Sequence, residues 1–432
     1  MPIAFSLLLI CIVFASGTAL QDGAAPQSLL AIFIVLALAR LATVARAADV
    51  KFVAQVTKGI KFAAAIPAAW MLIQVLPTPI GAHSIWSYAN EALGHESFGH
   101  ISVDLGATLR ALIWYLANLA LIIVAIFVTS DRRRAELVLL VLTSTAAAIS
   151  AVSLAATLGT LPFLVANEQS SRAFVAVAGF GVLLALTTCV RAVERYESRS
   201  AHSSGGLSLG HLQLILLAAG LVLLCCVSAL IASQAYNLGL VVLFSSLLFA
   251  SVQIVRRIGM GGWATTMLLA TIALAAIMIV VWRYDAARSV SPLLQFSTGS
   301  AEELSTVQRM LSDSGLKGFG AGTFAAVLPL YQASIHASSI PPTTIAAMAI
   351  ELGWPQIAVA LATAALLFAL LYRGALQRGR DAFYPGLSAA CVFLVAGQAF
   401  CDSSLLNSCV AVIADTIIGL GLAQSVSRRD VS

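Results

Sequence analysis

Long apolar runs separated by short polar stretches recur along the whole chain. A helix needs roughly 20 apolar residues to cross about 30 Å of hydrocarbon, and most of the runs approach that length. The pattern therefore predicts an all-α protein, a polytopic bundle of about twelve transmembrane helices. We place them at 2–20, 28–45, 60–76, 108–129, 137–157, 172–190, 211–233, 238–255, 264–282, 344–372, 383–400 and 409–425.

The basic residues predict how these helices are oriented. When the connections are numbered alternately, 18 of the 24 lysines and arginines fall in one set. Basic residues stay on the cytoplasmic side during insertion, so we expect that set, and both termini, to be cytoplasmic. The outer set holds only Arg110, Arg172, Arg283, Arg288, Arg309 and Lys317.

The composition agrees with this topology and excludes a water-soluble globular protein. Hydrophobic residues make up 60% of the 432 positions and charged residues 10%, with a mean hydropathy of +0.96; soluble domains carry about 25% charged residues. The net charge of +5 follows from the loop asymmetry. It gives no support to nucleic-acid binding, which needs basic residues clustered on one soluble face.

Two of the outer connections are long. A smaller loop covers 77–107, and a larger one covers 283–343 between the ninth and tenth predicted helices. Loops of this length are usually functional. The chain thus divides into 1–282 with the first nine helices, the large loop 283–343, and 344–432 with the last three helices.

The large loop contains "GLKGFGAGTFAAVLPLYQ", with Gly318, Gly320 and Gly322 at alternating positions. A dinucleotide fingerprint would need a further glycine where Thr323 stands, and the Gly-Lys-Ser/Thr of a P-loop is absent. Two interpretations stay open. The backbone N–H groups form an anion-binding nest, or the glycines only allow a tight turn that returns the loop to the bundle.

Two segments resemble the O-antigen ligase and polysaccharide polymerase superfamily. "LPTPIGAHSIWSYANEAL" followed by "HISVDLGATLRALIWYLANLALIIVAIF" is similar to that family's first outer loop and following helix, where an LPxP, a Trp and an ISxDxxAT pattern recur. "LKGFGAGTF" and the later "AMAIELGWPQIAVALA" resemble its large-loop GxGxGTF run and its AxELGxxG run. With the helix count and the position of the large loop, the resemblance extends over most of the chain.

The resemblance implies a bacterial inner-membrane glycosyltransferase of the GT-C type that works on the periplasmic side. Such an enzyme moves a glycan from a polyprenyl diphosphate carrier to a hydroxyl of a glycan or lipid acceptor, next to membrane lipids and other polysaccharide-assembly proteins. The diphosphate leaves easily once fixed cations and donors stabilise its charge, so no cofactor and no metal is expected.

The outer cations are the candidates for binding the diphosphate, because the arginine fork can hold phosphate oxygens bidentately. Arg309, in a helix-like run before the glycines, has a predicted catalytic role; a solvated surface charge is the alternative. Lys317 and the three glycines would contact the same anion. Arg288 follows the ninth helix, where arginines also snorkel to the interface. Arg172 lies where the family often has an N-R-N-H-x-A run.

The proton acceptor is expected on the large loop. Family ligases carry a His-Asn pair about nine residues before the glutamate of ELG, and Pro342 and Thr343 stand at those positions here. His336, six residues earlier, is our candidate base because histidine titrates near neutrality. An ordinary loop histidine is the alternative reading. His83, His95 and His100 of the smaller loop are further alternatives, and their irregular spacing predicts no metal site.

Ionisable residues within apolar runs need a partner or a cavity. We expect Glu351 to hold the large loop by accepting hydrogen bonds, Asp415 to make a structural pairing, and Asp104 to cap the fourth helix. Cys401 and Cys409 flank a short outer loop, where either a disulfide or two thiols fit the pattern.

Two functions of other classes stay open. A twelve-helix secondary transporter fits the helix count, although the long loop has no counterpart in the first half. A non-catalytic partner of polysaccharide assembly would explain the missing His-Asn pair.

Overall fold

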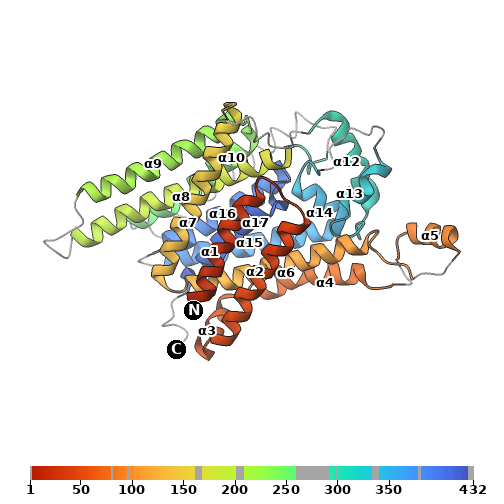
Figure 1. The fold of residues 1–432 in the computed structure, drawn as a ribbon, viewed down its shortest axis with the longest axis horizontal. Coiled ribbons are helices and arrows are strands. Elements are labelled where there is room, and N and C mark those ends of the chain that lie inside the picture. The colour runs from red at the N-terminus through yellow and green to blue at the C-terminus, as the bar shows by residue number, and fades with distance from the viewer. Residues whose placement is uncertain are drawn as a thin grey trace.

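The computed structural model describes residues 2–78, 81–94, 98–160, 168–200, 209–258, 291–297, 299–332, 340–377 and 381–426, and every regular element in them is a helix (Figure 1). The first half of the chain contains α1 (Pro2–Thr18), α2 (Ala24–Val44), α3 (Ala47–Val56), α4 (Lys61–Val75), α5 (Ile85–Leu93), α6 (Leu105–Thr129), α7 (Arg132–Thr157) and α8 (Glu168–Ser200). The second half contains α9 (Leu209–Ala232), α10 (Tyr236–Ile258), α12 (Ala301–Ser314), α13 (Phe324–Val327), η1 (Leu328–Leu330), α14 (Thr344–Leu352), α15 (Trp354–Gln377), α16 (Phe383–Cys401), η2 (Ser404–Leu406) and α17 (Ser408–Ser425).

Nine of the described helices are long and apolar enough to cross a membrane: α2, α6 to α10, and α15 to α17. The count becomes ten if α3 and α4, which meet at an angle of 81°, form one broken span. α1 is apolar but shorter. The predicted helix at 264–282 lies outside the described residues. The chain is thus an all-helical, multi-pass membrane protein.

The predicted span 344–372 is two helices instead of one, so its boundaries need correction. The break is at Gly353, whose φ of +89° favours glycine. A side chain there would meet the Leu316 carbonyl oxygen at 2.1 Å, and Pro355 cannot donate to a helix that continued through the break. The nine residues of α14 are too few to cross the bilayer, and only α15 is a candidate span.

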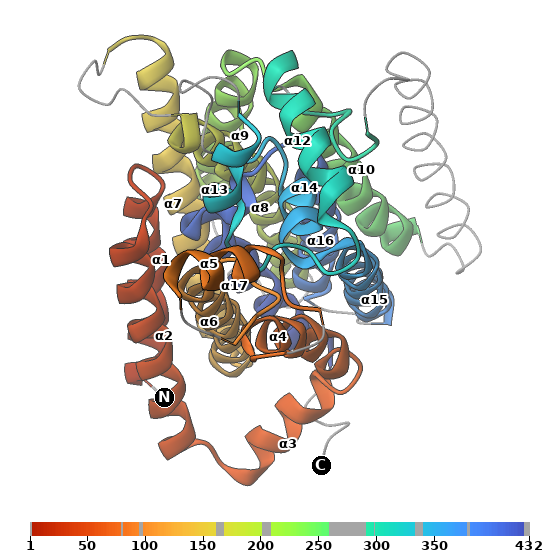
Figure 2. The same ribbon diagram turned by 90° about the vertical axis from the view of Figure 1, so that its right-hand side faces the viewer.

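The bundle is centred on α16 and α17, whose side chains are mostly buried. In Figure 2, α6 and α17 lie in the middle, with α1 and α2 on one side and α15 and α16 on the other. α9 lies against α7 and α8 and leaves a row of leucines exposed, among them Leu214, Leu217, Leu221 and Leu224. Exposed leucines of this kind suit a lipid-facing helix.

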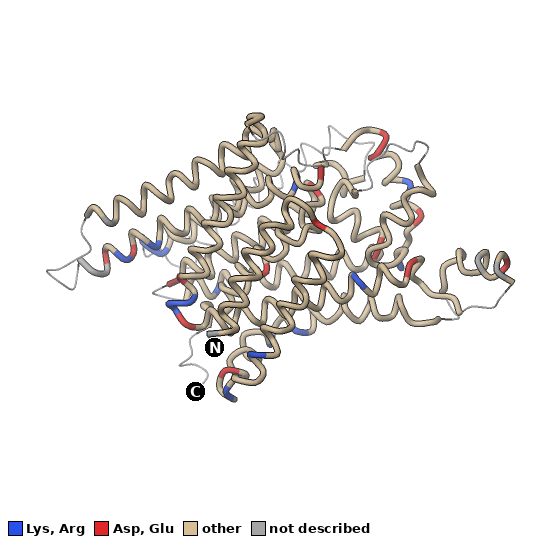
Figure 3. Tube along the Cα trace, viewed as in Figure 1, with Lys and Arg blue, Asp and Glu red and all other residues tan. Residues whose placement is uncertain are grey.

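One end of the bundle holds a network of ion pairs. Glu136, near the start of α7, pairs with Arg132, with Arg191 at 3.0 Å and with Arg195, and Arg132 also pairs with Asp381 at 2.9 Å. The arginine-rich connections that follow α6, α8 and α15 therefore lie at the same end of the bundle. Figure 3 shows more Lys and Arg there than at the end that carries α5 and α12.

The opposite end carries both long connections and a second hydrophobic core. α12 begins with a capping box, in which Ser300 N donates to Glu303 and Glu303 N donates to Ser300 Oγ. Its apolar face packs with α13 and α14 around Met310, Phe324 and Ile350. This layer covers the ends of the spanning helices, and the candidate sites lie in it and directly beneath it.

Candidate functional site

Each of the three alternating glycines packs against the backbone or a side chain of another segment. Gly318, Gly320 and Gly322 have φ values of +69°, +111° and +74°, the region that favours glycine. A Cβ on Gly318 would lie 2.3 Å from the Glu351 carbonyl oxygen, and one on Gly320 would lie 2.4 Å from Ser102 Oγ. The alternating glycines thus allow this segment to pack closely between the end of α14 and the start of α6. We call residues 315–324 the glycine turn.

The N–H groups of the glycine turn are already bonded to the protein. Phe324 N donates to Glu351 Oε1 at 3.2 Å, Gly320 N donates to the Glu351 carbonyl at 2.9 Å, and the Glu351 carboxylate also accepts from Gly322 N. Burial raises the pKa of Glu351 to about 7, and the two backbone donors oppose that rise. The nest therefore holds a carboxylate of the chain itself, and Glu351 anchors the loop as predicted.

Gln74 is a further anchor that the sequence analysis missed. Its fully buried side chain donates from Nε2 to the carbonyls of Lys317 and Glu351, at 3.1 and 3.0 Å, and accepts from Ala321 N at 3.2 Å. Trp70, one turn earlier on α4, donates to the Leu352 carbonyl at 2.8 Å. A lone glutamine inside the predicted span 60–76 was the available signal, because buried polar groups need partners.

The segment around Asp104 joins the smaller loop to the same turn. Asp104 caps α6 by accepting from Ala107 N at 3.0 Å, which confirms the predicted cap. Ser102 Oγ and Thr108 Oγ1 bond to each other at 2.7 Å, and Thr108 also donates to the Ala321 carbonyl at 3.0 Å. Two regions more than 200 residues apart in the sequence thus form one connected turn structure.

Arg309 and Lys317 are exposed; Lys317 is part of the glycine turn and Arg309 lies beside it. Arg309 projects from α12 and donates to the Tyr331 carbonyl at 3.1 Å, while the hydroxyl of Tyr331 donates to Asp313 at 2.9 Å. The Lys317 ammonium lies over Gly81 of the smaller loop. Neither cation lines the cavity that lies between α8, α10 and the end of α16.

His83 and His100 of the smaller loop have packing roles. His83 accepts from Ile85 N at 3.2 Å and its ring lies 5.5 Å from that of Phe319; burial lowers its pKa. His100 bonds to the Val75 carbonyl at 2.8 Å. The candidates His336, His95 and Arg288 lie outside the described residues. Among the described residues no group of three His, Cys, Asp or Glu side chains could hold a metal.

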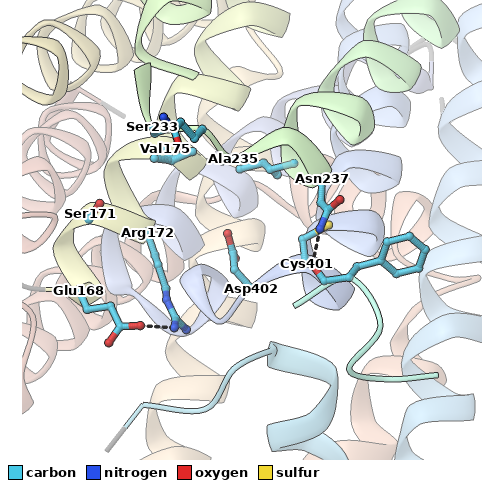
Figure 4. Close-up of a pocket in the computed structure, with 12 residues that line it drawn as sticks. Glu168, Ser171, Arg172, Val175, Ser233, Ala235, Asn237, Cys401 and Asp402 are labelled. Atoms are coloured by element: carbon cyan, nitrogen blue, oxygen red, sulfur yellow. Dashed lines mark hydrogen bonds and ion pairs between the residues drawn. The ribbon is translucent and has the colours of Figure 1, made fainter. Parts of the chain in front are cut away.

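A cavity of about 390 Å³ lies between α8, α10 and the end of α16. Figure 4 shows Arg172 and Asp402 beside each other, with Asn237 across from them. Its lining is completed by Glu168, Ser171, Val175, Ser233, Gln234, Ala235, Leu238, Phe296 and Cys401. A few polar groups that converge in a concave site of this size are typical of ligand pockets.

Arg172 is the cation of this cavity. Its Nη1 donates to the Pro341 carbonyl at 3.0 Å and to Ser403 Oγ at 2.8 Å, and its Nη2 pairs with Glu168. The Arg172 side chain is 15% exposed, and that of Glu168 is 50% exposed. The largely buried Arg172 guanidinium is therefore fixed by Pro341 and Ser403, and the half-exposed Glu168 carboxylate pairs with it on the side facing solvent.

Asp402 connects the cavity to the covering layer. Its side chain accepts from Ser404 N at 2.9 Å, and its carbonyl accepts from the N–H and the hydroxyl of Thr344, each at 2.9 Å. Burial raises the pKa of Asp402, while the Ser404 hydrogen bonds and the charge of Arg172 lower it. Asp402 was not predicted from the sequence; an acidic residue directly after an apolar run was its signal.

Cys401 and Cys409 are not joined by a disulfide, so the thiol alternative holds for this pair. Asn407 Oδ1 accepts from Cys409 N at 2.9 Å and starts α17 there. The Cys409 side chain is therefore directed into the core, where it is fully buried.

No protein-family model matches the chain, and no curated protein is significantly similar to it. The sequence resemblance to O-antigen ligases and polysaccharide polymerases therefore stays a prediction, and the geometry of the cavity has to support any function by itself.

Proposed function

We propose that this protein is a glycosyltransferase of the bacterial inner membrane that transfers a glycan from a polyprenyl diphosphate carrier to an acceptor hydroxyl. The acceptor is a growing glycan in a polymerase and a lipid in a ligase. In this proposal twelve helices cross the membrane, both termini are cytoplasmic, and the end of the bundle that carries α5 and α12 faces the periplasm.

The observation that carries the proposal is the position of Arg172. It is the one cation that lines the described cavity, and it lies at the end of the bundle where both long connections meet. A lipid-linked diphosphate enters from the membrane with its charge at the interface, so it needs a cation near the end of a span. A guanidinium held by Pro341 and Ser403 is oriented before the ligand arrives, and such preorganised charge stabilises a leaving diphosphate.

The ion pair with Glu168 determines how the diphosphate would bind. Glu168 is half-exposed in the first turn of α8, so its side chain can turn to solvent without moving the helix. A diphosphate carries more charge than a carboxylate and can likewise accept two hydrogen bonds from the fork. Glu168 lines the cavity, so in this proposal its displaced carboxylate is a second candidate proton acceptor, in addition to His336.

Gene deletion tests the proposal. We expect surface polysaccharide to change on gels: chains shortened on an unchanged lipid indicate a polymerase, and accumulated carrier-linked polymer indicates a ligase. Complementation with wild-type protein should restore the pattern, whereas Arg172→Ala at equal membrane abundance should not. An unchanged polysaccharide profile in the deletion strain would contradict the proposal.

A secondary transporter is the second candidate, because two helical segments are interrupted. The α3–α4 pair bends by 81° and the predicted tenth span breaks at Gly353; discontinuous helices of this kind form transporter sites. Uptake of labelled carrier or glycan into proteoliposomes, without any transfer product, would favour this function over the first.

A further inference from the structure

Two polar side chains lie in the middle of spanning helices, away from both ends of the bundle. Asp415 is on α17 and Asn118 is on α6. Each has a buried oxygen without a hydrogen-bond partner among the described residues, Oδ2 in Asp415 and Oδ1 in Asn118. Both atoms are acceptors when Asp415 is ionised, so neither can satisfy the other.

The register of the two helices puts these residues at the same level. Further along, a Cβ on Gly419 would lie 2.5 Å from the Ala125 side chain and 2.9 Å from the Ile122 carbonyl, and Gln424 Nε2 donates to the Thr129 carbonyl at 2.6 Å. α6 and α17 therefore run parallel. Asp415 lies one turn before Gly419 and Asn118 lies one turn before Ile122, and residues four apart share a helix face.

The surroundings of Asp415 are neutral. Tyr115 on α6 and Cys391 on α16, two groups that are neutral at physiological pH, interact electrostatically with it. Asp415 takes part in none of the ion pairs that the described residues form. The Tyr115 hydroxyl donates to the Ala64 carbonyl at 2.8 Å, so it is not available as a donor.

We propose that Asp415 is an intramembrane proton-binding site, in which the carboxyl group binds one proton and donates it in a hydrogen bond to Asn118 Oδ1. The neutral acid is the form that membrane depth favours, since an unpaired charge there is costly. One added proton converts Asp415 Oδ2 into a donor and gives both orphaned oxygens a partner. The site is independent of the proposed glycosyl transfer and does not involve the Arg172 cavity.

Carbodiimide labelling tests protonation directly, because the reagent adds to protonated carboxyl groups in apolar surroundings. The full-length protein in lipid nanodiscs is treated with dicyclohexylcarbodiimide at a series of pH values, and peptides are identified by mass spectrometry. We expect modification of Asp415 that decreases as the pH rises. Label should vanish in Asp415→Asn and persist in Glu351→Gln, which removes a buried carboxyl group elsewhere.

A double-mutant cycle tests the hydrogen bond even if the reagent cannot reach the site. We expect Asp415→Asn, which keeps a donor, to retain the wild-type Tm, and Asp415→Leu and Asn118→Leu each to lower it by several degrees. The double Leu variant should lose less than the sum of the two. Additive losses, or an Asp415→Asn variant as unstable as Asp415→Leu, would overturn the proposal. So would a Tm of the wild type that rises with sodium concentration, because a bound cation would then occupy the place of the proton.

Discussion

The glycine turn and the Arg172 cavity both have the chemistry of an anion site, and they differ in what already occupies them. At the turn, the backbone donors that would form a nest are bonded to Glu351 and to other carbonyls, and a Cβ on Gly318 or Gly320 would clash with its neighbours. At the cavity, a guanidinium faces about 390 Å³ of open space and its carboxylate partner is half-exposed.

The comparison shows that donors alone do not make a binding site. A ligand must displace whatever the donors hold, and displacing the buried Glu351 would leave an unpaired carboxylate next to packed backbone. Displacing Glu168 moves a surface side chain into water.

Gly318→Ala should abolish the folded protein. The new methyl group would lie 2.3 Å from the Glu351 carbonyl oxygen at a φ of +69°, and a backbone clash of this size is expected to cost on the order of 4 kcal/mol or more. Membrane abundance and Tm measure the effect. Gly315→Ala is the matched control, since it has a φ of +58° but open space around its Cβ, so only strain of about 1–3 kcal/mol remains. Normal abundance of Gly318→Ala with lost transfer would make the turn a binding site after all.

Arg172→Ala and Arg172→Lys should each reduce transfer by about 100-fold or more, with unchanged abundance. The lysine keeps the charge but cannot hold Pro341, Ser403 and a phosphate with one planar fork. Transfer by membranes with a polyprenyl-diphosphate donor is the measurement. Arg309→Ala, at an exposed position beside the glycine turn, should stay near wild type. A reversed result, with Arg309 essential and Arg172 dispensable, would return the site to the turn, as the sequence analysis predicted.

Glu351→Ala should destabilise the protein by about 1–3 kcal/mol, because it leaves buried N–H groups without acceptors, whereas Glu351→Gln keeps one acceptor.

The stability of the wild-type protein should also depend on pH. Because burial raises the pKa of Glu351 from 4.5 to about 7, ionisation costs more in the folded state, so stability should fall as the pH rises through this window. Tm against pH for wild type and Glu351→Gln checks this. Identical pH profiles would show that Glu351 does not titrate there.

Glu168→Gln should have the smallest effect, a several-fold lower KM for the lipid donor at unchanged kcat. The substitution removes the negative charge that neutralises Arg172, so the guanidinium should bind phosphate more tightly. Steady-state kinetics with varied donor separate the two constants. If kcat falls by about 100-fold instead, Glu168 is the proton acceptor, and the role predicted for His336 moves to it.

Much of the local structure could be predicted from the sequence. The hydrophobic runs marked the nine candidate spanning helices that the structure describes, Asp104 was recognised as the cap of α6, and Glu351 as a group that holds the loop. These features depend on neighbours within a few residues, and helix periodicity and caps are local properties. The break at Gly353 was missed because an apolar run does not show which glycine meets another backbone.

The sequence by itself determined that the chain is a membrane-embedded helical protein with its basic residues gathered in alternate connections, because bilayer thickness and insertion act on segments of about 20 residues. Only the tertiary structure decided which polar groups meet. Arg172 lies 169 residues from Pro341 and 231 residues from Ser403 in the chain, and Gln74 bonds to a turn 243 residues away. Such contacts follow from the packing of the entire bundle, in which a shift of one helix by a single turn would pair each donor with a different acceptor.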